Sequence, residues 1–94
     1  MDFHVSNDAI TLRDEKGQTV AEVDFPAMEN NMVNICHTYV SPSLRGQKVA
    51  DRLLLALVEK LRAEGKKAYP TCSYAVRWFS QHPEHSDLCS ESRC

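Results

Sequence analysis

A strand, a helix and a second strand follow one another in this 94-residue chain, and this order constrains the fold more than any other feature. The longest strand candidate is Met32–Val40, where apolar and polar residues alternate. Apolar residues then recur at helical spacing over Gln47–Glu64, and Lys67–Cys72 is a short strand. Because such crossover units are almost always right-handed, the two strands should run parallel. This unit predicts a domain of the α+β or α/β class with a mixed sheet.

Three shorter strands precede this unit, and a second helix follows it. Alternating residues predict the strands at Phe3–Ser6, Ile10–Arg13 and Val20–Phe25, which should form an antiparallel meander. The second helix is expected over Ser73–Gln81, capped by its first residue and ended by Pro83. The predicted order is therefore four strands, a helix, a strand and a helix.

Length and composition indicate one ordinary globular domain. Hydrophobic residues make up 43% of the chain and charged residues 26%, which is enough for a single modest core. We expect this domain to span residues 1–88, with a flexible polar tail at 89–94.

The charge pattern and the hydropathy argue against two kinds of partner. The formal net charge is −2 and the basic residues are scattered, whereas nucleic-acid binding needs clustered lysine and arginine. No stretch approaches the roughly 18 apolar residues that span a membrane, and the polar N-terminus is unlike a secretory signal. We therefore expect a cytoplasmic protein with no nucleic-acid or membrane partner, whose four cysteines are free thiols.

The turn between the long strand and the helix, Ser43–Ala50, has the properties of an anion site. The first amides of a helix lack partners within the helix, and together with the helix dipole they attract phosphate. Gly46 lets the backbone approach a phosphate closely, while Arg45 and Lys48 add positive charge. The same residues also fit an ordinary helix start with a solvated basic pair, so the spacing alone leaves both interpretations open.

The segment Arg45–Ala50 resembles the loop that binds the acetyl-CoA pyrophosphate in GCN5-related N-acetyltransferases, Arg/Gln-x-x-Gly-x-Gly/Ala. Arg45 matches the first position of this motif and Ala50 the last. Lys48 stands where the motif has glycine, and this departure bears on the backbone conformation at that position and on affinity.

Three further segments resemble a short YjdJ-like branch of the same superfamily, in order and at fitting spacing over residues 3–88. They are the strand motif His37–Val40, the Pro-x-Cys-x-Tyr segment Pro70–Tyr74 and a C-terminal signature over Trp78–Leu88. The resemblance implies a minimal fold of this superfamily, in which the last two strands run parallel and splay apart before a C-terminal helix.

The resemblance also implies acetyl-CoA as the cofactor and an unidentified amine as the acceptor, with a protein or peptide amine as one candidate. The pantetheine arm would lie between the splayed strands, and a backbone amide near Tyr39 or Val40 would polarise the thioester carbonyl. The residues implied in cofactor binding are Thr38, Tyr39, Val40, Arg45, Gly46, Gln47, Lys48, Val49, Ala50 and Cys72.

Cys72, His37 and Tyr74 are the catalytic candidates. Cys72 falls at the end of the second splayed strand, where its thiol could accept the acetyl group and pass it on, with His37 as base. Tyr74 could protonate the CoA thiolate that leaves. Each residue also has a structural alternative, because buried cysteines, histidines and tyrosines more often pack or form hydrogen bonds.

Strand signals follow one another through Phe25, without the helices that shape the acceptor site in larger acetyltransferases, so the acceptor side should be open. Two functions remain: an N-acetyltransferase acting by direct attack of the amine or through Cys72, and a non-catalytic module that binds CoA or a protein. A weaker third possibility is a metal-based or thiol-based redox module built on the cysteines. Separately, His82, His85, Cys89 and Cys94 form a run that resembles a zinc site, but its spacing fits no standard zinc pattern.

Overall fold

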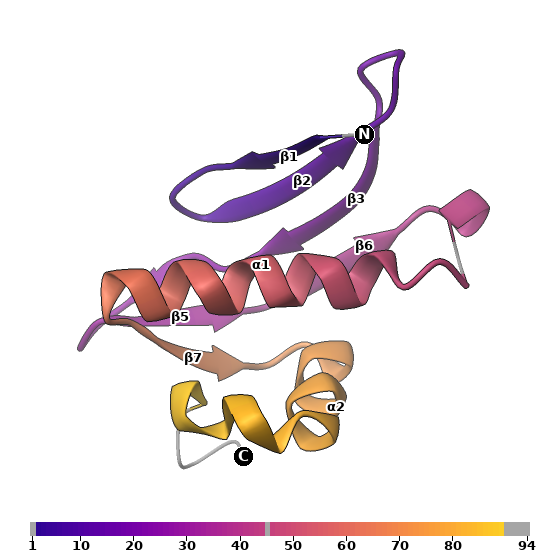
Figure 1. Cartoon of the computed structure of the whole chain (residues 1–94). Helices are drawn as coiled ribbons and strands as arrows, with labels where there is room; N and C mark the ends of the chain where they lie inside the picture. The colour runs from indigo at the N-terminus through magenta and orange to yellow at the C-terminus, as the bar shows by residue number, and fades with distance from the viewer. Residues whose placement is uncertain (1, 45, 90–94) are drawn as a thin grey trace.

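Helix α1 packs across two β-sheets that lie next to each other in the computed structural model of the chain (Figure 1). The structure describes residues 2–44 and 46–89. The first sheet contains β1 (Asp2–Val5), β2 (Ala9–Arg13), β3 (Thr19–Asp24) and β6 (His37–Val40), in that order. The second sheet contains β4 (Ala27–Met28), β5 (Met32–Ile35) and β7 (Lys67–Pro70). The helical elements are η1 (Pro42–Leu44), α1 (Val49–Glu64), α2 (Ser73–Gln81) and η2 (Pro83–Leu88), of which η1 and η2 are 3₁₀ segments. The α+β class with a mixed sheet is therefore confirmed.

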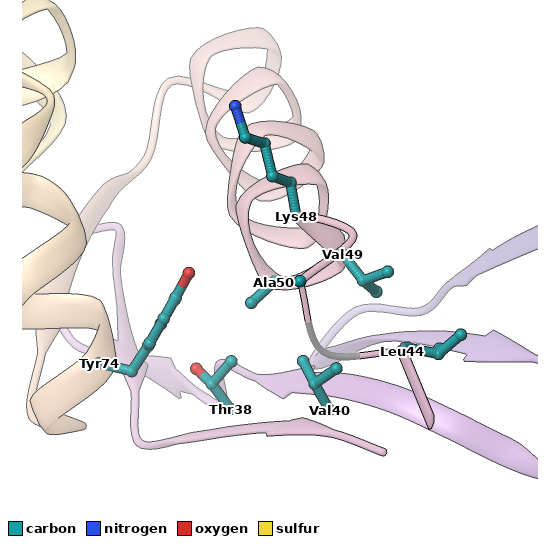
Figure 2. Close-up of a pocket in the computed structure, with 8 residues that line it drawn as sticks. Thr38, Val40, Leu44, Lys48, Val49, Ala50 and Tyr74 are labelled. Carbon is teal, nitrogen blue, oxygen red and sulfur yellow. The ribbon is translucent and has the colours of Figure 1, made fainter. Parts of the chain in front are cut away.

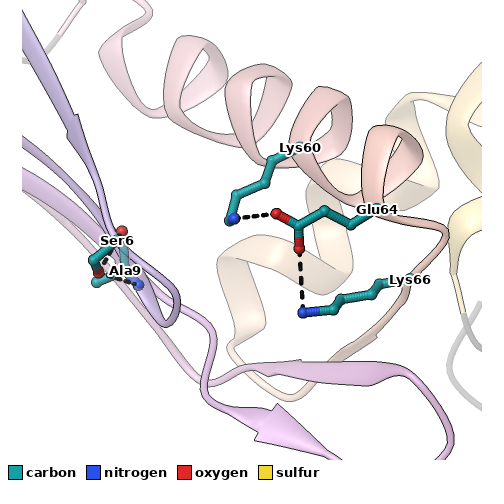
Figure 3. A network of polar contacts seen from close by, with 5 residues as sticks. All are labelled: Ser6, Ala9, Lys60, Glu64 and Lys66. Atoms are coloured by element: carbon teal, nitrogen blue, oxygen red, sulfur yellow. Dashed lines mark hydrogen bonds and ion pairs between the residues drawn. The ribbon is translucent and has the colours of Figure 1, made fainter.

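The first three strands form the antiparallel meander that their alternating residues predict. β1 pairs with β2 and β2 with β3, in a register that places Phe3 opposite Leu12 and Leu12 opposite Ala21. The turn between β1 and β2 is tight, because the Ser6 amide donates to Ala9 O at 2.9 Å and the Ala9 amide donates to Ser6 Oγ at 3.1 Å (Figure 3). In this stretch of the described chain, the strands follow each other with no helix between them.

The strand predicted over Met32–Val40 is two strands that belong to different sheets. β5 pairs in parallel with β7, with Ile35 opposite Pro70, whereas β6 pairs antiparallel with β3, with His37 opposite Asp24. The predicted parallel pairing is thus confirmed for the first half of the segment only. The chain changes sheets at Cys36, whose amide donates to Asp24 O at 3.1 Å. This divergence is the splay that the resemblance implies.

The break at Cys36 also resets the alternation of side chains. A continuous strand would place Val33, Ile35, His37 and Tyr39 on one face. In the structure Val33 and Ile35 are buried, whereas His37 and Tyr39 are exposed and their neighbours on β6 turn inward. The expectation of one uninterrupted alternation is therefore wrong, because the kink exchanges the two faces of the chain.

α1 supplies the largest part of the single hydrophobic core of the described residues. Leu53, Leu57 and Leu61 recur at helical spacing and are completely buried. Gly65 ends the helix in the left-handed conformation, as expected, and beside it Glu64 forms ion pairs with Lys60 and Lys66 (Figure 3). The helix begins at Val49, two residues later than predicted.

The C-terminal segment is packed more extensively than its polar sequence predicts. The bounds of α2 agree with the prediction, although its N-cap is Cys72 and not Ser73. Beyond α2, Leu88 and Cys89 are buried, and Cys89 forms a β-bridge with Ala68. A flexible tail therefore cannot begin at Cys89, and residues 90–94 lie outside the described part of the chain. Cys89 is disulfide-bonded, which corrects the expectation of four free thiols, whereas Cys36 and Cys72 are free as expected.

Neither α1 nor any other helix in the described part of the chain combines the length and the apolar composition needed to cross a membrane.

Candidate functional site

A cavity of about 330 Å³ opens at the N-terminal end of α1, between β6 and the start of α2 (Figure 2). Its position follows from the fold: the chain leaves the second sheet at Cys36, continues as β6 of the first sheet, and reaches the start of α1 after η1. The wall is mostly apolar, with a hydroxyl from each side. The lining residues are Thr38, Val40, Leu44, Gly46, Lys48, Val49, Ala50 and Tyr74.

The start of α1 presents backbone amides at the edge of this cavity. The first helical hydrogen bond runs from the Arg52 amide to Lys48 O at 3.1 Å, so the amides before Arg52 precede the hydrogen-bond ladder. Gly46 has a φ of 84° and Lys48 a φ of 57°, both in the left-handed region. Lysine thus adopts the conformation that glycine takes most readily, and the chain turns sharply into the helix.

Cys72 stands where β7 gives way to α2, next to the cavity. Its sulfur lies 3.7 Å from Thr38 Oγ1, across the splay, and its amide and that of Thr71 both donate to Ile35 O at 3.0 Å. Partial burial raises the pKa of the Cys72 thiol, but hydrogen bonds from the Ala75 amide, from Thr38 and from the Tyr74 amide outweigh it. The pKa therefore lies below its ordinary value of 9.0, which favours the nucleophilic thiolate.

Tyr74 stands opposite Val49 and Leu44 in the cavity wall, with its hydroxyl beside the first turn of α1 (Figure 2). Burial raises the pKa of the Tyr74 hydroxyl above 10.0, and the negative charge of Asp51 raises it further. Tyr74 therefore keeps its proton at neutral pH and can act as a donor to a group in the cavity.

Comparison with known families shows which family the chain belongs to. The family model described as GCN5-related N-acetyl-transferase matches residues 9–88 of the chain, which include every residue of the cavity wall. The chain belongs to this family. No curated protein matches it.

Solved structures support the assignment to the acetyltransferase family. A GCN5-like protein from Staphylococcus aureus, described as an N-acetyltransferase, is 29% identical, with a TM-score of 0.80 over 95% of this chain and 87% of that one. A Klebsiella pneumoniae protein described as an acyl-CoA N-acyltransferase is 27% identical, with a TM-score of 0.55 over 63% of this chain and 41% of that one. N-acetylglutamate synthase from Neisseria gonorrhoeae, solved with coenzyme A and N-acetyl-glutamate, is 16% identical, with a TM-score of 0.64 over 89% of this chain and 25% of that one, and shows the fold alone.

Most of the cofactor-binding residues expected from the acetyltransferase motifs meet in one place. The cavity wall contains six of them: Thr38, Val40, Gly46, Lys48, Val49 and Ala50. Gln47 is exposed and stands outside the wall, and Arg45 lies outside the described residues. Cys72 is not part of the wall but contacts it through Thr38.

His37 and Tyr39 lie on the opposite face of β6 from Thr38 and Val40. The exposed side chain of His37 is near Glu22 and Asp24 on the open face of the first sheet. The hydrogen bond to Asp24, then burial, and then the charge of Asp24 raise the pKa of the Glu22 carboxyl, while His37 lowers it. The geometry therefore does not bring His37 to the thiol of Cys72, for which it was the candidate base.

Nothing in the described residues forms a metal centre: no group of three histidine, cysteine or acidic side chains is placed to hold an ion. His82 and His85 stack on the Trp78 ring instead, with ring centroids 4.1 and 5.6 Å from it. Cys94, the last residue of the suggested zinc run, lies outside the described part of the chain.

Two residues of the site were missed by reasoning from the sequence. Leu44 closes one end of the cavity, and Asp51 lies in the first turn of α1, where it acts on Tyr74. An aspartate in a first helical turn is common because it complements the helix dipole, so its position alone gave no sign of a second role.

Proposed function

We propose that this protein binds acetyl-CoA at the N-terminal end of α1 and transfers the acetyl group to an amine. The observation that carries the proposal is the cavity itself, because its wall is built from the segment matching the cofactor loop and from β6. The proposed setting is the cytoplasm, where the exposed thiol of Cys36 stays reduced, whereas the disulfide at Cys89 is a feature that does not fit it.

The residues present fit such a cofactor. The helix-start amides and the left-handed backbone at Gly46 and Lys48 form a concave donor surface of the kind that binds phosphate oxygens. A cavity of about 330 Å³ is at the small end of ligand pockets, so it would enclose only part of the cofactor. The remainder would lie over the exposed surface beside Gln47 and Lys48.

The acetyl group can reach the amine by two routes, and direct attack needs the fewer steps. In direct attack the neutral amine forms a bond to the acetyl carbon, the bond from that carbon to the CoA sulfur breaks, and the amine loses a proton. Tyr74, protonated at neutral pH, is placed to supply a proton to the departing thiolate.

In the second route the Cys72 thiolate attacks first. A thioester forms on the Cys72 sulfur as the CoA thiolate leaves, and the amine then takes the acetyl group and restores the thiol. The hydrogen bonds that lower the pKa of Cys72 support this route, and its contact with Thr38 places the sulfur next to the cavity.

The acceptor is proposed to be an exposed amine, with a protein or peptide amine as the first candidate. The described chain makes only the tight turn Ser6–Ala9 between β1 and β2, so α1 covers one face of the first sheet and the other face, which carries the exposed side chains of His37 and Tyr39, is open. An open face can receive a bulky acceptor that a closed pocket would exclude.

A calorimetric titration with acetyl-CoA tests the proposal, with two alanine-to-glutamate variants of α1 as a matched pair. Ala50→Glu places a carboxylate in the cavity wall, whereas Ala63→Glu makes the same change on an exposed position near the other end of the helix. We expect the Kd to rise by about tenfold or more in Ala50→Glu, because like charges repel at short range, and by less than about twofold in Ala63→Glu. Equal Kd values in the two variants would contradict the site.

Turnover is tested separately, by CoA release with a panel of amines and peptides. Release that depends on the amine supports the transferase. Tight binding with no release from any amine would instead support a non-catalytic module on the same scaffold. Mass spectrometry after acetyl-CoA addition distinguishes the routes, because only the second gives an acetyl adduct that Cys72→Ala removes.

A further inference from the structure

The C-terminal signature residues Trp78 and His82 are not in the cavity wall, yet both lie against Asp51 at the start of α1. Trp78 Nε1 donates to Asp51 Oδ1 at 2.7 Å. His82 Nε2 lies 3.4 Å from the same oxygen. One carboxylate oxygen of α1 is therefore shared by two rings from the C-terminal part of the chain.

The Trp78–Asp51 contact fixes α2 against the first turn of α1. The Trp78 ring is 2% exposed, and its Nε1–H can only donate, so it requires an acceptor inside the fold. Asp51 is that acceptor.

His82 holds the Trp78 ring from the other side. Its ring stacks on Trp78 with centroids 4.1 Å apart, and its Nδ1 lies 2.7 Å from Trp78 O. A carbonyl oxygen only accepts, so Nδ1 carries a hydrogen, and Nε2, which faces Asp51, donates to the carboxylate when the ring is protonated on both nitrogens. The three side chains thus form one unit in which each restricts the other two.

This unit adjoins both sides of the cavity. Asp51 follows Ala50, which is part of the wall, and Trp78 lies one helical turn after Tyr74 on α2, so Tyr74 and Trp78 share a face of that helix. Figure 2 shows the Tyr74 hydroxyl beside the first turn of α1, the turn that contains Asp51.

We propose that Asp51 is a positioning residue of the site: anchored by Trp78 and His82, its carboxylate sets the place of Tyr74 in the cavity and the charge around it. This inference rests on the proposed function for its catalytic meaning, because Tyr74 is there the proton donor to the departing thiolate. It gives the Trp78 and His82 signature a role in the reaction, exerted through Asp51.

The negative charge of Asp51 distinguishes a positioning role that acts on Tyr74 from a purely structural role, in which Asp51 only accepts the hydrogen bond from Trp78. After burial, that charge is the second cause of the raised pKa of Tyr74. A packing role would need only the oxygen that accepts from Trp78, which an asparagine also provides.

Asp51→Asn keeps that oxygen and removes the charge, and Asp87→Asn is its matched control. Asp87 also joins α1 to the C-terminal part of the chain, through an exposed ion pair with Arg62 at 2.8 Å, but it belongs to η2 and not to the cavity. The ionisation of Tyr74 is followed by NMR of ¹³C-labelled tyrosine in the protein without added cofactor, with the resonance assigned by Tyr74→Phe.

We expect the pKa of Tyr74 to fall by about half a unit or more in Asp51→Asn and to stay unchanged in Asp87→Asn. Trp78→Phe is the second variant, in case Asp51→Asn does not fold. It keeps the charge but frees the carboxylate to turn toward water, so the pKa of Tyr74 should move in the same direction by a smaller amount. An unchanged Tyr74 pKa in the folded variants, or an equal fall in Asp87→Asn, would overturn the proposal.

The catalytic arm measures kcat and KM for acetyl-CoA in the same variants. Asp51→Asn should lower kcat by about tenfold and change KM by less than about threefold, because a Tyr74 that is no longer held in place loses its alignment with the departing thiolate. This loss of alignment outweighs the stronger acidity that the lower pKa of Tyr74 would give. If no amine gives CoA release even with the unsubstituted protein, the proposed function fails, while the tyrosine titration still decides the positioning role.

Discussion

The sulfur of Cys72 lies 3.7 Å from the hydroxyl oxygen of Thr38, and this contact joins the two sheets at the point where they diverge. Thr38 belongs to β6 of the first sheet, and Cys72 follows β7 of the second. The Cys72 thiol and the cavity wall, which are distant in the sequence, are thereby brought together, so the effects of single substitutions at the site can be predicted.

The contact itself should tune the reactivity of Cys72. Thr38→Val removes the hydroxyl that favours the thiolate, so the pKa of Cys72 should rise and its alkylation by iodoacetamide at pH 7.5 should slow by about threefold. The rate is measured against pH in a Cys36→Ser background, because Cys36 is an exposed thiol that would also react. Thr11→Val on β2 is the control, and an equal slowing there would contradict the assignment.

The left-handed conformation of Lys48 predicts a site where glycine increases stability. A residue other than glycine loses about 1 kcal/mol of stability in this conformation. Glycine avoids this strain in the folded state, but it also increases the entropy of the unfolded chain, which offsets part of the gain. Lys48→Gly should therefore leave stability unchanged or raise it by up to about 1 kcal/mol, whereas the β-branched Lys48→Val should lower it by about 1–2 kcal/mol. Urea unfolding measures both, and a loss of stability in Lys48→Gly would show that the lysine side chain is itself stabilising.

Glu22 and Asp24 predict a pH dependence on the open face of the first sheet. Because the folded-state pKa of Glu22 is raised above 4.5, its contribution to stability is fully present below that pH and is lost as the pH rises through the folded value. The Glu22→Gln variant cannot ionise at this position and so keeps that stability. At pH 7 the variant should be more stable than the unsubstituted protein by about 0.5 kcal/mol, after allowance for screening by water.

The difference should vanish near pH 4, where Glu22 binds its proton. Urea unfolding at the two pH values gives the comparison, with Glu59→Gln on the exposed side of α1 as the control. A stabilisation that persists at pH 4 would mean that ionisation of Glu22 beside Asp24 is not its cause.

Two adjacent leucines of α1 should differ sharply in their contribution to the core. Leu54 is completely buried, whereas Leu55 is 37% exposed. Leu54→Ala should lower the free energy of unfolding by about 3 kcal/mol, through lost burial and the cavity that remains, and Leu55→Ala by less than about 1 kcal/mol. Circular dichroism during urea unfolding measures both values. Similar losses of stability in the two variants would contradict the orientation of α1 in which Leu54 faces the core and Leu55 faces solvent.

The elements that depend on local pattern could be predicted from the sequence. The meander and the bounds of α2 follow from alternation and helical spacing, and Gly65 ends α1 because few other residues take the left-handed conformation easily. The motif Arg45–Ala50 likewise located the cavity wall, since a helix start always presents unpaired amides.

The strands whose bounds depend on which other strand they pair with could not be predicted from the sequence. Within Met32–Val40 the alternation continues across Cys36, and only the pairing of one half with β7 and of the other with β3 shows the break. The short strand β4 was not predicted for a similar reason. Two residues are too few to show an alternation of apolar and polar side chains, and they form a strand only because they pair with β5.

The sequence by itself therefore determined the helices, the meander and the family loop, because these follow from the properties of neighbouring residues. Tertiary structure alone decided that His37 faces away from Cys72, that Thr38 faces toward it, and that Asp51 joins Trp78 to the edge of the cavity. The physical reason is that side-chain direction after a kink, and hydrogen bonds between residues 27 or 34 positions apart, are fixed by long-range packing that local pattern does not encode.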